Sequence, residues 1–121
     1  ELALQVSKEL NLLKHHEKEF NVLTVYGGVS IDDQINELRR GVDIFVGTTG
    51  RVMDHIDRKN FDFSELKNII LDEADQMLKL GFKEDVERIM TTIRDKGPKS
   101  IQFVFFSATI PFWVKSVAEE Y

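Results

Sequence analysis

The chain has 121 residues, 42% of them hydrophobic and 31% charged, which fits one folded domain and excludes collagenous or disordered proteins. It has no cysteine, which excludes disulfides, thiol nucleophiles and thiolate metal sites and fits a reducing, intracellular compartment. Its 21 acidic against 16 basic residues give a net charge of -5, which argues against a domain coated in basic residues, so any contact with RNA or DNA must be local.

The first part of the chain carries a helix pattern, a strand pattern and a second helix pattern. Apolar residues at helical spacing predict an amphipathic opening helix, and they are Leu2, Val6, Leu10 and Leu13. β-Branched and aromatic residues predict a strand over residues 20–26, which Gly27 and Gly28 end. Ser30 and Gly41 are typical cap residues and bound the second predicted helix.

The middle of the chain continues the alternation. A strand is predicted over residues 42–46, and Thr48 or Thr49 can cap the helix that follows it. The residues expected on the inner face of this helix are Val52, Met53 and Ile56. Another strand is predicted over residues 66–71, and its continuously apolar end, residues 69–71, indicates a strand covered on both faces.

The last part of the chain contains two further helix patterns around a strand over residues 101–106. The first helix ends at Gly97 and Pro98, and its apolar positions are Phe82, Val86, Ile89, Met90 and Ile93. Pro111 opens the second. The residues expected on the buried side of this last helix are Val114, Val117, Ala118 and Tyr121.

Helices between consecutive strands imply right-handed crossovers, and therefore an α/β fold with a mostly parallel sheet and helices on both faces. Ligands of such sheets bind beyond the carboxyl ends of the strands. The residues that follow the four predicted strands are small, hydroxyl-bearing, basic or acidic. They are Gly27, Gly28, Gly47, Thr48, Thr49, Gly50, Arg51, Asp72, Glu73, Ala74, Asp75, Ser107, Ala108 and Thr109.

The acidic pair among these residues has the chemistry of a nucleotide-hydrolase strand end. Mg²⁺ prefers hard oxygen ligands, often through water, and Asp72 at the strand tip could supply one. A general base must lie within hydrogen-bond reach of the attacking water, and Glu73 is the neighbour that could be so placed. The alternative is that each strand end, taken alone, is an ordinary polar turn or helix cap.

Together, the strand ends resemble the ordered motifs of the first RecA-like domain of the DEAD-box ATP-dependent RNA helicases. The name motif is spelled by Asp72, Glu73, Ala74 and Asp75, and Ser107, Ala108 and Thr109 stand at the coupling motif. The other positions that match the family pattern are Glu1, Leu2, Ala3, Gly27, Gly28, Gln34, Leu38, Gly41, Met77, Leu78, Gly81 and Phe82. The resemblance covers essentially the whole chain.

This resemblance implies that ATP and Mg²⁺ are used at the acidic motif, with Asp72 holding Mg²⁺ through water and Glu73 acting as the base. Asp75 would reach arginines of a second RecA-like domain of the same parent chain. Ser107 and Thr109 would hydrogen-bond to the acidic motif and couple the nucleotide state to strand separation. The residues implied to contact the RNA backbone, without regard to base sequence, are Gly27, Gly28, Thr48, Gly50 and Arg51.

The chain departs from the family pattern in two respects. The usual Thr-Pro-Gly-Arg motif has Thr49 in place of proline, which restores a backbone N–H at the start of a helix. The phosphate loop, Gly-x-x-x-x-Gly-Lys-Thr, and the adenine-reading segment before it do not occur in the 121 residues. We therefore expect residues 1–121 to be an N-terminally truncated part of the first helicase domain, inactive by itself and without the second domain.

Residues around Gln76 and after Pro111 are most similar to the nucleolar RNA helicase II/Gu subgroup, which implies a nuclear or nucleolar location. Two other functions are considered. A non-catalytic RNA- or protein-binding module with a degenerate helicase fold would lack ATPase activity. A phospho-acceptor signalling domain with Asp72 as acceptor would need an acidic pair after the first strand, where this chain has Gly27 and Gly28.

The remaining polar and aromatic candidates are interpreted as structural. His15 and His16 are adjacent on a predicted helix and diverge by about 100°, so they are expected to be solvated histidines. His55 lies between acidic residues and is expected at the surface. Phe112 and Trp113 could stack on a base, but core or interdomain packing is favoured.

Overall fold

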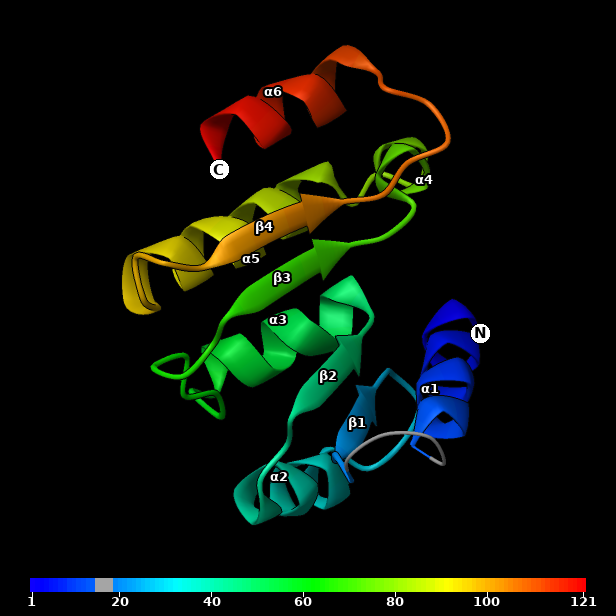
Figure 1. Ribbon diagram of the computed structural model, residues 1–121, viewed down its shortest axis with the longest axis vertical. Coiled ribbons are helices and arrows are strands. Elements are labelled where there is room, and N and C mark those ends of the chain that lie inside the picture. Colours follow the sequence, from blue (N-terminus) through cyan, green and yellow to red (C-terminus); the bar gives the residue numbers. More distant parts are fainter. Residues whose placement is uncertain (15–18) are drawn as a thin grey trace. The chain divides into compact units, whose positions relative to one another are not determined.

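The computed structural model describes residues 1–14 and 19–121, so His15 and His16 lie outside the described residues. One or two helices separate consecutive strands along the chain (Figure 1), and two compact units form, unit 1 over Glu1–Phe61 and unit 2 over Asp62–Tyr121. None of the helices in the described residues is long and apolar enough to span a membrane.

Unit 1 pairs its two strands in parallel. Its elements are α1 (Leu2–Leu13), β1 (Val22–Val25), α2 (Ile31–Arg40), β2 (Ile44–Gly47) and α3 (Thr49–Asp57). Val22 lies opposite Ile44 and Val25 opposite Gly47 in the ladder, so both strands end at the same edge. The parallel pairing predicted for these strands is confirmed.

The bounds of α2 follow from local capping chemistry. The hydroxyl oxygen of Ser30 accepts the backbone N–H of Asp33 at 3.4 Å, which satisfies one of the unpaired donors of the first turn. Gly41 ends the helix with φ 98°, in the positive range that side chains disfavour, and its N–H donates to the carbonyl of Leu38. Both predicted caps are confirmed.

The buried face of α1 differs from the predicted one. Ala3 and Ser7 are buried, whereas Leu2 and Leu13 are 37% and 55% exposed. The hydroxyl of Ser7 hydrogen-bonds to the hydroxyl of Thr24 in β1, so the helix approaches the strand through its small residues. Close approach favours small side chains, and the leucines at the edges of that face are therefore left in contact with solvent.

Unit 2 has a second parallel pair of strands. Its elements are β3 (Asn68–Leu71), α4 (Ala74–Lys79), α5 (Lys83–Lys96), β4 (Gln102–Phe105) and α6 (Phe112–Glu120). Asn68 lies opposite Gln102, and Leu71 lies opposite Phe105. Three helices enclose one apolar core, whose buried members are Ala74, Val86, Met90, Trp113, Val114 and Val117. The short helix α4 was not predicted.

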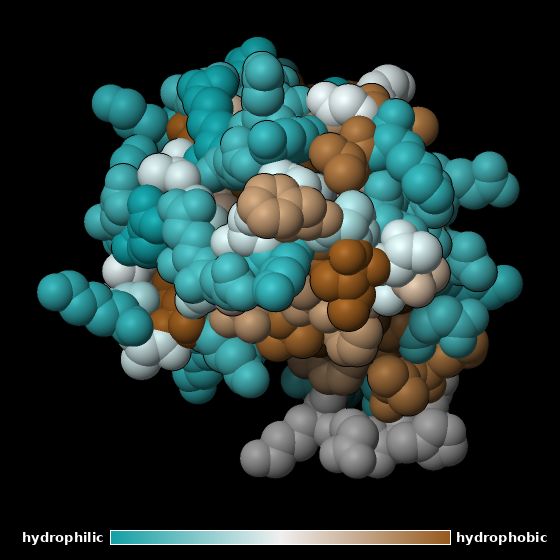
Figure 2. Space-filling view, turned by 90° about the horizontal axis from the view of Figure 1, so that it is seen from above, coloured by the Kyte–Doolittle hydropathy of each residue, from teal (hydrophilic) through white to brown (hydrophobic). Residues whose placement is uncertain are grey.

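Two burial predictions in unit 2 are wrong. Ile70 is 63% exposed, because burial alternates along β3 and only Ile69 and Leu71 are partly buried. Ala118 is exposed, since the inner side of α6 is filled by larger residues. Hydrophobic side chains thus also reach the surface (Figure 2), and the most exposed of the large ones among the described residues is Phe112 at 86%.

Candidate functional site

The acidic motif forms a tight turn between β3 and α4. Glu73, which precedes the helix, has φ 51° and ψ 45°, a left-handed conformation that non-glycine residues rarely adopt. Backbone hydrogen bonds to Phe106 flank the turn: the N–H of Phe106 donates to the carbonyl of Leu71 at 2.8 Å, and the N–H of Ala74 donates to the carbonyl of Phe106 at 3.0 Å. The end of β4 therefore holds the strained residue from both sides.

We expect Glu73→Gly to leave the protein more stable than Glu73→Ala by about 1 kcal/mol, because glycine adopts the left-handed conformation without a Cβ clash. Both substitutions remove the carboxylate, so the difference between them isolates the backbone strain. Urea unfolding of the two variants measures it. Equal unfolding free energies would contradict a strained turn.

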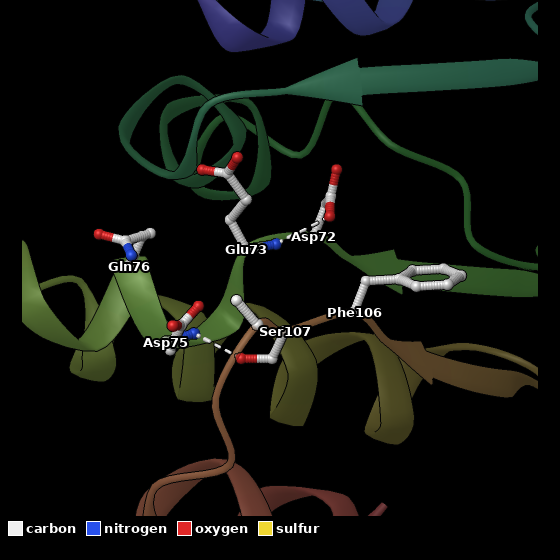
Figure 3. A pocket seen from close by; sticks show the side chains of 7 residues that line it. Asp72, Glu73, Asp75, Gln76, Phe106 and Ser107 are labelled. Atoms are coloured by element: carbon white, nitrogen blue, oxygen red, sulfur yellow. Dashed lines mark hydrogen bonds between the residues drawn. The ribbon is translucent and has the colours of Figure 1, made fainter.

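The acidic turn opens onto a shallow pocket of about 360 Å³ in unit 2. Its lining residues are Asp72, Glu73, Asp75, Gln76, Phe106, Ser107 and Ala108. Asp72 and Glu73 extend to the same side of the turn, whereas Asp75 lies on the other side next to Ser107 (Figure 3). The carboxylates are therefore divided into an exposed pair, available to a ligand, and one enclosed member.

Asp75 is the enclosed carboxylate, with a relative exposure of 3%. The hydroxyl of Thr109 donates to Asp75 Oδ2 at 2.8 Å, and the backbone N–H of Asp75 donates to Ser107 Oγ at 3.1 Å. Ser107 Oγ in turn donates to the carbonyl of Thr109 at 2.5 Å. These bonds join the start of α4 to the segment after β4, which are the acidic and coupling motifs of the sequence.

The protonation of Asp75 follows from these bonds. The hydroxyl of Thr109 lowers the pKa of Asp75 below its ordinary value, and Ser107 lowers it further, although burial acts in the opposite direction. Asp75 is therefore a carboxylate at neutral pH. A charged acceptor of this kind strengthens the hydrogen bond from Thr109.

Few side chains at the acidic turn could bind a metal ion. No three His, Cys, Asp or Glu side chains gather as metal ligands in residues 1–14 and 19–121. Asp72 and Glu73 are exposed, and Asp72 Oδ1 also accepts the backbone N–H of Glu73 at 2.9 Å. One or two carboxylates fit Mg²⁺, which keeps several waters and takes further oxygens from phosphate groups.

The residues implied to contact RNA lie in unit 1, where β1 and β2 end. Gly27 and Gly28 lie between β1 and α2, and Thr48, Gly50 and Arg51 form the start of α3. The backbone N–H of Thr48 donates to the carbonyl of Val25 at 3.0 Å, which places the two segments side by side. Gly28 has φ 85°, and a Cβ added at Gly27, Gly28 or Gly50 would meet no atom within 4 Å.

Arg51 contacts the chain itself. Its Nη1 and Nη2 donate to the carbonyl of Val29 at 3.1 Å and 3.0 Å, and Nη1 also donates to Gln34 Oε1 at 3.1 Å. The guanidinium is therefore held against the glycine-containing segment, a contact that sequence reasoning did not predict. The Gln34 position was recognised only as part of the family pattern.

The predicted surface position of His55 is wrong. Its side chain has no exposed surface, its Nε2 lies 2.9 Å from Gln34 Oε1, and its Nδ1 lies 3.1 Å from Asn60 Nδ2. Burial lowers the pKa of His55, Arg51 lowers it further, and Asp54 opposes this. The helical spacing of Met53 and Ile56 could have indicated a buried neighbour.

The two aromatic candidates of α6 have different environments. Trp113 is buried in the core of unit 2, and its indole N–H donates to Glu87 Oε1 at 2.7 Å, which confirms the favoured structural role. Phe112 is 86% exposed, so core packing within unit 2 is wrong for this residue. The pair therefore does not act as one aromatic surface.

The parallel strands, and the acidic turn with its hydroxyl partners, define an α/β protein with polar residues at the carboxyl ends of its strands. Residues 1–117 match the family model of the DEAD/DEAH box helicases, and the chain belongs to this family. It is 44% identical over 122 residues to "ATP-dependent RNA helicase DDX50" of Mus musculus, covering 100% of this chain and 16% of that protein.

Two solved structures have the same fold. A DEAD box protein from the hyperthermophile Methanococcus jannaschii is 40% identical with a TM-score of 0.88, covering 99% of this chain and 31% of that one. The DEAD-box helicase Mss116, bound to ssRNA and UDP-BeF, is 29% identical with a TM-score of 0.85, covering 98% and 25%. The predicted RecA-like α/β fold is confirmed. The chain spans only a small part of each relative.

Proposed function

We propose that this chain is part of the first RecA-like domain of an ATP-dependent RNA helicase. The intact protein would couple ATP hydrolysis to RNA binding and to local duplex unwinding or ribonucleoprotein remodelling. The observation that carries the proposal is the direct hydrogen bonding of the acidic motif to Ser107 and Thr109. In this arrangement, Asp75 belongs to the proposed nucleotide site and is also hydrogen-bonded to the coupling segment.

In this proposal, the exposed pair of carboxylates serves the nucleotide. Asp72 would hold Mg²⁺ through water, and the bound ion would neutralise charge on the phosphates. Glu73 would take the proton of the attacking water, since its carboxylate is exposed on the same side of the turn as that of Asp72 (Figure 3). The phosphate loop does not occur in these 121 residues, so we expect no ATP hydrolysis from them alone.

The enclosed carboxylate would link the nucleotide site to the coupling segment after β4. Asp75 is tied to both coupling residues and so responds to any movement of the segment after β4. A second RecA-like domain of the parent chain would meet this region through arginines, in line with the family resemblance.

The predicted nuclear or nucleolar location depends on the subgroup resemblance alone, and imaging of a tagged protein tests it.

The RNA surface is proposed at the ends of β1 and β2. Gly27, Gly28 and Gly50 have open space at their Cβ positions, so the backbone there is accessible to a phosphate. The RNA-bound structure of Mss116 supports an RNA-binding role for the fold. Because contacts of this kind involve phosphate and sugar, binding would be indifferent to base sequence.

We expect Arg51→Ala in the intact protein to weaken binding of all single-stranded RNAs alike. The slope of log affinity against log salt should fall by about 0.7, the value for one phosphate contact on a single strand. Titration of two unrelated RNAs at several salt concentrations measures both effects. An unchanged slope, or a strong preference for one RNA, would contradict a phosphate contact by Arg51.

The overall proposal is tested by ATP hydrolysis of the intact protein with and without RNA. Stimulation by RNA, together with separation of a short duplex, would support the helicase. RNA binding without any hydrolysis would instead support the non-catalytic binding module.

A further inference from the structure

A buried polar network lies in unit 1, and none of its residues belongs to the lining of the acidic pocket. Its central side chains are Gln34, which is 5% exposed, and His55, which has no exposed surface. Asn60 and Arg51 flank them with hydrogen bonds of 3.1 Å each, to His55 Nδ1 and to Gln34 Oε1 respectively. Polar side chains are rarely buried without a purpose, since burial is costly unless every group is paired.

The contacts determine the direction of each hydrogen bond. Gln34 Nε2 lies 3.3 Å from the carbonyl of Tyr26, and Gln34 Oε1 receives Arg51, so the amide can adopt only this orientation. Because Gln34 Oε1 can only accept, His55 Nε2 must carry the proton of the ring. His55 Nδ1 then has the lone pair, and the amide N–H of Asn60 donates to it.

The network holds the glycine loop, residues 26–29, at two points. Gln34 donates to the carbonyl of Tyr26 at the start of the loop, and Arg51 donates twice to the carbonyl of Val29 at its end. Between these points, Gly27 and Gly28 have open space at their Cβ positions. The loop thus has little side-chain packing of its own, and hydrogen bonds from α2 and α3 keep its carbonyls in place.

We propose that Gln34 and His55 are positioning residues that hold the glycine loop, directly and through Arg51, in the conformation that binds the RNA backbone. The inference rests on the proposed RNA-binding role of this loop. His55 itself does not touch RNA, because its side chain is buried. It acts by keeping Gln34 Oε1 in place, where the same oxygen also orients the Arg51 guanidinium.

The charge state of His55 agrees with this role. Burial and the positive charges of Arg51 and Arg58 lower the pKa of His55 and so favour the neutral ring, whereas the charge of Asp54 acts in the opposite direction. A second proton on Nδ1 would point at the donating amide of Asn60. The network therefore needs neutral His55 with its proton on Nε2.

The test uses the intact protein and compares three variants with wild type. His55→Leu removes both ring nitrogens, whereas His55→Gln retains an N–H donor that can reach Gln34 Oε1. Met53→Ala is the matched control, because Met53 is also buried in α3 and its truncation destabilises the unit, yet it makes none of the hydrogen bonds of the network. Amide hydrogen exchange of residues 27–29 without RNA is measured first, and RNA affinity by fluorescence anisotropy second.

We expect His55→Leu to accelerate amide exchange in the glycine loop and to weaken RNA binding about tenfold. A tenfold loss is the effect expected from removing one hydrogen bond in a network that includes a charged group. His55→Gln should recover most of both effects, and Met53→Ala should leave both unchanged. Loop exchange in His55→Leu that matches Met53→Ala would overturn the inference. So would faster loop exchange with unaltered RNA affinity.

Two further outcomes separate the inference from the proposed function. A wild-type protein that binds no RNA would reject the proposed function, and with it the RNA part of the inference, while the exchange data would still report on the loop. Nitrogen NMR of the wild-type histidines, assigned with His55→Gln, gives the ring tautomer and does not depend on any destabilised variant. A proton on Nδ1 instead of Nε2 would overturn the network.

Discussion

Glu73→Gln is expected to stop ATP hydrolysis in the intact protein while ATP and RNA binding persist. The amide has the shape of the carboxylate but cannot take a proton, and general bases contribute about 100-fold or more to turnover. The left-handed conformation of Glu73 is a property of the backbone and its bonds to Phe106, so this substitution leaves the turn in place. Single-turnover hydrolysis with saturating RNA measures the chemical step, and the variant should accumulate as an ATP-bound complex on RNA.

The matched control is Glu84→Gln, which makes the same chemical change at an exposed position in the first turn of α5, outside the pocket. It should hydrolyse ATP as wild type does. Wild-type turnover in Glu73→Gln would remove this residue from the role of base. Loss of ATP binding in the same variant would instead show that the carboxylate is needed for the ground state.

Local chemistry explains which elements could be predicted from the sequence. The helix α2 has a hydroxyl cap at Ser30 and a positive-φ glycine at Gly41, and both act within one turn of the helix. The acidic motif was also recognisable, since Asp72 and Glu73 follow an apolar strand in the order that the family pattern requires. Such features depend on neighbours in the sequence.

The features that were missed depend on distant partners. The conformation of Glu73 is held by Phe106, which directly follows β4 and is distant in the sequence, and α4 is too short to show a clear period. His55 has acidic neighbours in sequence, yet Gln34 and Asn60 supply its buried partners. In α1, the bond from Ser7 to Thr24 turns the small residues inward, which hydrophobicity alone does not indicate.

Thr109→Val is expected to separate the two activities of the intact protein, lowering RNA unwinding about tenfold or more while ATP hydrolysis falls much less. Valine has nearly the shape of threonine, and residue 109 is exposed, so the fold should tolerate the change. The hydroxyl donor to Asp75 Oδ2 is lost, however, and with it the largest cause that lowers the pKa of this carboxylate. Asp75 then keeps its backbone bond to Ser107, but its carboxylate loses its hydrogen bond to the segment after β4.

Thr109→Ser is the matched control, because it retains the hydroxyl and removes only a methyl group. Ser107→Ala is the second test of the same link, since it removes the acceptor of the Asp75 backbone N–H. Unwinding of a short duplex and RNA-stimulated ATP hydrolysis are measured on the same preparations. If both activities fall in equal proportion in Thr109→Val and Ser107→Ala, the hydroxyls serve the ATP site itself, because a group that only transmits the nucleotide state to the RNA would leave hydrolysis largely intact.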